Sequence, residues 1–106
     1  MRTLLKVTMP VEPANKAIKD GALPKIVQSL ADSLRPEATY FYAEGGKRTA
    51  LLVFDLKDPA QIPAVAEPLF MQLNAGVEFF PVMNTEDLKA GLEKAAKQAG
   101  RAAVSV

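Results

Sequence analysis

The feature that most constrains the fold is a pair of glycines, Gly45-Gly46, between two runs of β-forming residues. Two glycines in a row suit a two-residue hairpin turn, because its central positions need positive φ. We therefore predict a strand over residues 39–44 and a second strand over residues 47–56. If Glu44 and Lys47 flank the turn, the register of the whole hairpin is fixed.

In that register Tyr42 pairs with Thr49, and Tyr40 pairs with Leu51. Alternation then assigns every hairpin side chain to one of two faces. One face carries Phe41, Ala43, Arg48, Ala50, Leu52 and Phe54, and the other carries Tyr40, Tyr42, Thr49, Leu51 and Val53. Both faces are too apolar to meet water, so we expect each of them to be covered.

The rest of the chain supplies helices and two further strands. Residues 3–9 and 77–83 are predicted as strands, and helices are predicted over residues 14–20, over residues 23–34, from Asp58-Pro59 to Leu73, and from Asn84 or Thr85 onward. Gly21 suits a left-handed cap between the first two helices.

Three sequence details refine these elements. Pro68 removes a backbone donor inside its helix, so we expect a kink or break between Ala64 and Pro68. Pro81 indicates an edge strand, since proline cannot donate to a neighbouring strand. The last helix has a thin apolar stripe, so we expect it to pack on a partner or on the domain edge and to fray after Gly100.

The order strand, helix, strand, strand, helix, strand predicts one α+β domain of ferredoxin-like type over residues 1–106, with a C-terminal helix added. Right-handed crossovers place the helices on one face of a four-stranded antiparallel sheet and leave the other face open. A chain this short has little stability to spare, so we expect a homodimer formed through the open face.

Composition excludes several classes of function. The chain has neither cysteine nor histidine, which removes thiolate nucleophiles, imidazole bases and the usual zinc ligands, and we expect no metal and no cofactor. A net charge of +1 without a basic stripe argues against a nucleic-acid partner. The sequence has no long apolar run and no signal-peptide pattern, so we expect a cytoplasmic protein that does not contact a membrane.

The pattern resembles the dimeric α/β-barrel superfamily, in which two ferredoxin-like sheets meet face to face around a cavity. It also resembles a small bacterial family of uncharacterised proteins, through the strings Pro36-Glu37-Ala38, Gly46-Lys47-Arg48-Thr49, Glu67-Pro68-Leu69-Phe70 and Pro81-Val82-Met83 followed by Glu86-Asp87-Leu88. The superfamily includes cofactor-free monooxygenases, muconolactone isomerase and haem enzymes, so the resemblance implies several chemistries. The haem branch fits least, because its histidine ligand has no counterpart here.

Five residues on the open face are candidates for ligand contact. Tyr40 and Tyr42 offer phenols to a small aromatic or carbonyl ligand, although interface packing explains the same aromatics. Lys6 is expected opposite Glu78, where the two side chains would form an acid and base pair or a simple cross-strand ion pair. Thr49 shares this face.

Three other polar residues are candidates outside that face. Arg48 is expected among the helix-facing residues, where it binds an anionic ligand or pairs with Glu37, Glu44 or Glu67. Glu67 and Asn15 lie beside helix interruptions, where irregular backbone often lines a ligand mouth.

Three hypotheses for function remain open at this point. The first is a homodimeric module that binds a small aromatic or lipid-like molecule in an apolar cavity between the sheets. The second is a cofactor-free isomerase or monooxygenase that uses Tyr40, Tyr42, Lys6 or Glu78 for proton transfer. The third is a structural dimer whose side chains fill the interface completely.

Overall fold

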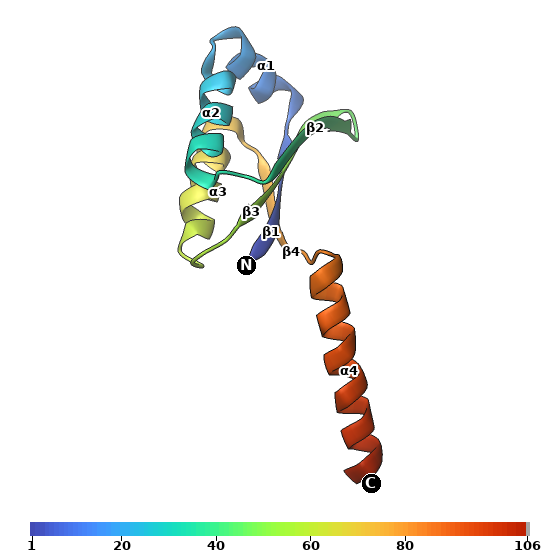
Figure 1. Cartoon of the computed structure of the whole chain (residues 1–106). Coiled ribbons are helices and arrows are strands. Elements are labelled where there is room, and N and C mark those ends of the chain that lie inside the picture. The colour runs from blue at the N-terminus through green and yellow to red at the C-terminus, as the bar shows by residue number, and fades with distance from the viewer. Residues whose placement is uncertain (106) are drawn as a thin grey trace.

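The computed structural model describes the backbone of residues 1–105 and the side chains of residues 1–100. It has four strands and four helices, all expected from the sequence pattern (Figure 1). In chain order these are β1 (Arg2–Met9), α1 (Val11–Lys19), α2 (Ala22–Leu34), β2 (Ala38–Glu44), β3 (Lys47–Asp55), α3 (Gln61–Leu73), β4 (Gly76–Pro81) and α4 (Thr85–Ser105).

The four strands form one antiparallel sheet in the order β2-β3-β1-β4, which is compatible with a ferredoxin-like fold. The hairpin register is confirmed, since Glu44 pairs with Lys47 and Tyr42 pairs with Thr49. Gly45 and Gly46 both have positive φ, at 59° and 76°, as the two-residue turn requires.

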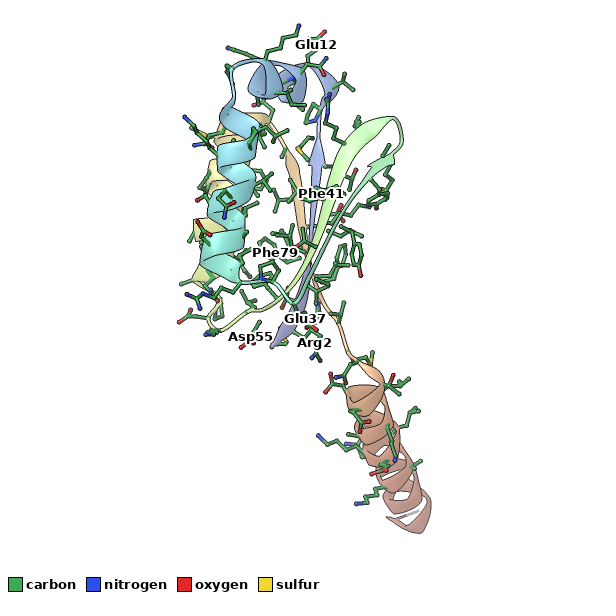
Figure 2. The ribbon with its side chains drawn as sticks, turned by 45° about the horizontal axis from the view of Figure 1, so that its top comes forward. Arg2, Glu12, Glu37, Phe41, Asp55 and Phe79 are labelled. Carbon is green, nitrogen blue, oxygen red and sulfur yellow. The ribbon has the colours of Figure 1, made fainter. Side chains whose placement is uncertain are left out.

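Helices α1, α2 and α3 lie on one face of the sheet and leave the other face uncovered (Figures 1 and 2). The core between the layers is apolar and consists mainly of alternate residues of β1 and β3 with the inner faces of the helices. Its largest fully buried apolar side chains are Phe54, Leu5, Leu69, Leu73 and Val7.

Phe41 departs from this plan. We predicted it as a core residue together with Phe54, but Phe41 is 58% exposed whereas Phe54 is 2% exposed. Alternation does place both rings on the helix side, yet β2 is an edge strand and all of its residues from Thr39 to Glu44 are exposed. The helices cover the inner strands and the other edge strand, where Val77 and Phe79 pack against the core, but they leave the β2 edge uncovered.

The predicted break at Pro68 is wrong, because α3 runs without interruption from Gln61 to Leu73. The lost hydrogen bond would have joined Pro68 to the carbonyl of Ala64, and both residues are exposed. Water can therefore hydrate the free carbonyl, which lowers the cost of proline inside the helix.

The β4 strand lies at an edge of the sheet, as Pro81 indicated. Helix α4 then starts as expected, because Asn84 Oδ1 accepts from Asp87 N at 2.8 Å while Asp87 Oδ2 accepts from Asn84 N at 3.1 Å. The helix continues past Gly100 to Ser105, and fraying of this end stays a prediction.

Helix α4 points away from the domain instead of packing on its edge (Figure 1). Arg2 connects its first turn to the body, with Nε 2.6 Å from Glu37 Oε1 and Nη1 3.2 Å from Asp87 Oδ2. The molecule is 64 Å long, and its radius of gyration of 18.3 Å exceeds the roughly 13 Å of a compact chain of this length. Leu88 and Leu92 on α4 are exposed, so packing on a partner remains a prediction.

None of the described helices is long and apolar enough to cross a membrane.

Candidate functional site

The uncovered sheet surface, which we call the open face, is the main candidate. It consists of the strand residues whose side chains point away from the helices: Leu4, Lys6, Thr8, Tyr40, Tyr42, Glu44, Thr49, Leu51, Val53, Glu78 and Phe80. Tyr40 is 65% exposed, and Tyr42 and Phe80 are each 40% exposed. Such a concentration of apolar surface on one face is typical of an interface or a ligand site.

A polar cluster lies within this apolar surface. Lys6 Nζ is 2.6 Å from Glu44 Oε2, and the Tyr42 hydroxyl donates a hydrogen bond to Glu44 Oε1. Lys6 belongs to β1 and Glu44 to β2, and β3 runs between these strands. The ion pair therefore spans β3 on the open face.

The hydrogen bonds within the cluster stabilise one charge state of each of its three side chains. The hydrogen bond to Glu44 raises the pKa of Lys6 above its ordinary value, and the nearby carboxylate charge adds to the effect. Hydrogen bonds from Lys6 and Tyr42 lower the pKa of Glu44. The hydrogen bond to Glu44 also raises the pKa of Tyr42. At neutral pH the cluster is thus an ammonium, a carboxylate and a neutral phenol.

The expected pairing of Lys6 with Glu78 is only half right. The two residues are register partners on β1 and β4, but the ammonium group forms its ion pair with Glu44. Glu78 gives the smallest of the contributions that raise the pKa of Lys6. Sequence reasoning missed Glu44 because it was assigned only to the turn, although its spacing of two from Tyr42 places it on the same face.

Thr49 lies on the open face but is 1% exposed in the single chain. Its register partners are Thr8 on one side and Tyr42 on the other, and its hydroxyl donates to the carbonyl of Lys47 at 3.2 Å. With its hydroxyl proton engaged and its side chain buried, Thr49 offers no surface to a ligand in the single chain.

Arg48 belongs to a different part of the molecule. Its side chain is on the helix side of the hairpin, where Nη1 donates to Asn15 Oδ1 on α1 at 2.9 Å. The predicted pairing with Glu37, Glu44 or Glu67 is wrong, since Glu37 binds Arg2 and Glu44 binds Lys6. Asn15 and Arg48 thus connect α1 to the hairpin, and Glu67 is exposed on α3.

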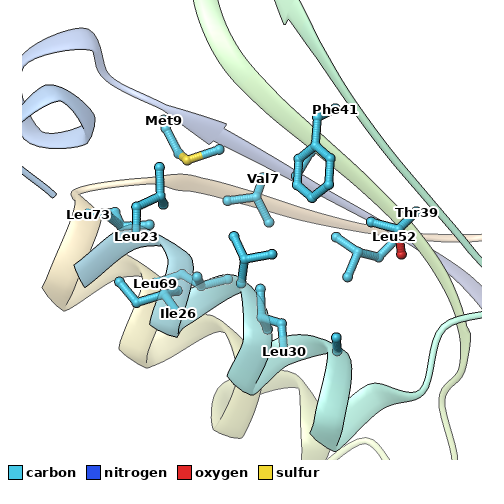
Figure 3. Close-up of a pocket in the computed structure, with 13 residues that line it drawn as sticks. Val7, Met9, Leu23, Ile26, Leu30, Thr39, Phe41, Leu52, Leu69 and Leu73 are labelled. Carbon is cyan, nitrogen blue, oxygen red and sulfur yellow. The ribbon is translucent and has the colours of Figure 1, made fainter. Parts of the chain in front are cut away.

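A second apolar feature is a slot between α2 and the sheet (Figure 3). Its lining is almost entirely apolar and includes Val7, Leu23, Ile26, Leu30, Phe41 and Leu52. Its volume of about 40 Å³ is well below the roughly 150 Å³ of an engineered cavity that accepts benzene. The slot therefore holds no aromatic ligand in this conformation.

Metal binding finds no support, since the described residues contain no group of three potential ligand side chains. Comparison with known proteins adds no identity, because no protein-family model and no curated protein matches the chain.

Proposed function

We propose that a second copy of the chain covers the open face and that the space between the two sheets binds a small aromatic molecule carrying an oxygen acceptor. One observation carries this proposal, namely the Lys6–Glu44–Tyr42 cluster beside the apolar residues of the open face. Small-molecule sites commonly combine apolar walls with a few polar groups that fix orientation.

A second copy is the natural cover because the face is large and the domain is small. Leu4, Leu51 and Val53 are half-buried in the single chain, and Tyr40 and Phe80 are exposed beside them. Packing this surface against the same surface of another copy removes apolar area from water without needing any other protein.

The hydrogen-bonding capacity of the cluster indicates the class of ligand. Glu44 already accepts from Lys6 through one oxygen and from Tyr42 through the other. Lys6 has three ammonium hydrogens, of which the contact with Glu44 uses one. The free donors of Lys6 suit a carboxylate, carbonyl or phenolate oxygen, while the ring of Tyr40 suits an aromatic body.

The pKa directions favour binding over catalysis. Proton transfer is most effective when the pKa of the catalytic group lies near the working pH. The pKa of Lys6 and the pKa of Tyr42 are instead raised, and the pKa of Glu44 is lowered, so all three move away from neutrality. We therefore favour a binding role over an isomerase or monooxygenase activity.

Thermal unfolding with benzoate, and with benzyl alcohol as the ligand that lacks the carboxylate, tests the proposal. A ligand at ten times its Kd stabilises the native state by about 1.4 kcal/mol, which corresponds to a rise of several degrees in Tm. We expect benzoate to raise the Tm of the wild type, and we expect benzyl alcohol to raise it less.

The matched variants are Lys6→Met, which keeps the aliphatic stem, and Lys19→Met, which removes a lysine at the end of α1. Lys6→Met should lose the benzoate effect, and Lys19→Met should keep it. An equal shift in both variants, or no shift with either ligand, would overturn the proposed site. An oligomer that binds neither ligand would correspond to the structural dimer instead.

A further inference from the structure

The two edges of the sheet differ in how they are protected. On the β2 edge, Tyr40, Phe41 and Tyr42 are 65%, 58% and 40% exposed, so aromatic surface is open on both faces of the strand. The strand has no proline and no lysine, and its one charged residue is Glu44 at the end. Natural proteins usually protect a free edge with proline, with charged residues such as lysine, or with a helix or loop that covers it.

The hairpin turn determines which backbone groups of β2 are free. Glu44 and Lys47 flank a two-residue turn with positive φ at both glycines, so they exchange both of their backbone hydrogen bonds. Alternation from that pair directs every second residue toward β3 and the others away from the sheet. The residues whose N–H and C=O groups point outward are Thr39, Phe41 and Ala43.

The β4 edge is protected by comparison. Val82 N donates to the carbonyl of Arg2, so the even-numbered residues of β4 bond to β1 and the odd-numbered residues point outward. Pro81 is therefore an outward-facing residue that has no N–H group. The contrast leaves β2 as the edge that is able to accept another strand.

We infer that β2 pairs antiparallel with β2 of a second copy, about a two-fold axis at Phe41. This interface uses the strand edge rather than the open face, so it goes beyond the proposed function. The occupant is a second copy because the aromatic residues of the strand are symmetric about Phe41, with Tyr40 on one side and Tyr42 on the other. A two-fold interface brings each residue to the mirror position of its partner, so this symmetry places aromatic side chains against aromatic side chains.

This pairing satisfies both the backbone and the side chains. The three outward residues of each copy form about six hydrogen bonds across the axis. Tyr40 then lies across from Tyr42 of the second copy on the open face, and the two Phe41 rings meet on the helix side, as favourable aromatic cross-strand pairs. The two Glu44 carboxylates stand roughly 20 Å apart, so their charges do not oppose the contact.

Amide hydrogen exchange of the wild type, followed residue by residue by NMR, tests the inference without any substitution. We expect the amides of Thr39, Phe41 and Ala43 to be protected as strongly as those of Tyr40 and Tyr42, which bond to β3. Rapid exchange at Thr39, Phe41 and Ala43, with slow exchange at Tyr40 and Tyr42, would overturn the edge interface. A dimer formed only through the open face would give this combination of rapid and slow exchange.

Light scattering on two variants provides an independent test. Ala43→Pro removes one outward N–H group, and its matched control Ala43→Ser keeps it. We expect Ala43→Pro to halve the molar mass relative to Ala43→Ser and the wild type, whereas an unchanged mass would overturn the inference.

Leu51→Glu places a charge on the open face and tests the interface of the proposed function separately. If both interfaces exist, the wild type has four copies, while Ala43→Pro and Leu51→Glu each have two. If only the edge pairs, the wild type and Leu51→Glu have two copies and Ala43→Pro has one.

Discussion

Phe41 and Phe54 offer a paired measurement of how the helices cover the sheet. Both rings are on the helix side, but Phe54 on β3 is 2% exposed and Phe41 on β2 is 58% exposed. Replacing a buried phenylalanine with alanine typically costs about 3–5 kcal/mol, so we expect that cost for Phe54→Ala. Phe41 buries only about two fifths of its surface, which scales the expected cost of Phe41→Ala to about 1–2 kcal/mol.

Urea denaturation followed by circular dichroism measures both free energies of unfolding, at a dilution where light scattering gives single chains. The dilution matters because a partner strand on β2 would bury Phe41 and increase its apparent cost. A difference of about 2 kcal/mol or more between the variants is expected. Equal costs would refute the conclusion that the helices leave the β2 edge uncovered.

Three further predictions concern other parts of the chain. Pro68→Ala restores a backbone donor on the exposed side of α3 and should stabilise the protein by less than about 3 kcal/mol in urea denaturation, because the free carbonyl is hydrated; a loss of stability would mean that Pro68 has a packing role. The pKa of Glu44 is lower in the fold than in the unfolded chain, so its contribution is present above the ordinary value of 4.5 and disappears as the pH falls through the folded value. Glu44→Gln should therefore lose less stability than the wild type when Tm is measured from pH 6 down to pH 2, and identical pH profiles would contradict the cluster. Removing residues 84–106 should change the urea unfolding free energy of diluted single chains by only about 0.5 kcal/mol, because α4 points away from the domain, and a much larger loss would show that α4 packs on it.

The hairpin register was predictable because two independent signals agree on it. The glycine pair fixes the turn, and the period of two in the flanking residues fixes the faces. The edge position of β4 was predictable from Pro81 alone, because a missing N–H group is a local property of one residue.

The burial of Phe41 was not predictable by the same reasoning. Alternation tells which face of the sheet a side chain occupies, but it does not tell whether a helix lies over that strand. That depends on where the helices lie, and they cover Phe79 on the β4 edge but leave the β2 edge exposed. The partner of Lys6 depended on the strand order, because the side chain reaches across β3 to Glu44 instead of pairing with its neighbour Glu78.

The central claim is that the open face is covered in solution, and paramagnetic relaxation by a soluble agent tests it most directly. In the single chain Tyr40 is 65% exposed, Leu5 is fully buried and Met71 is 81% exposed. We predict that side-chain signals of Tyr40, Leu51 and Val53 broaden as little as those of Leu5 in the wild type. Broadening of Tyr40 comparable to that of Met71 would contradict the account.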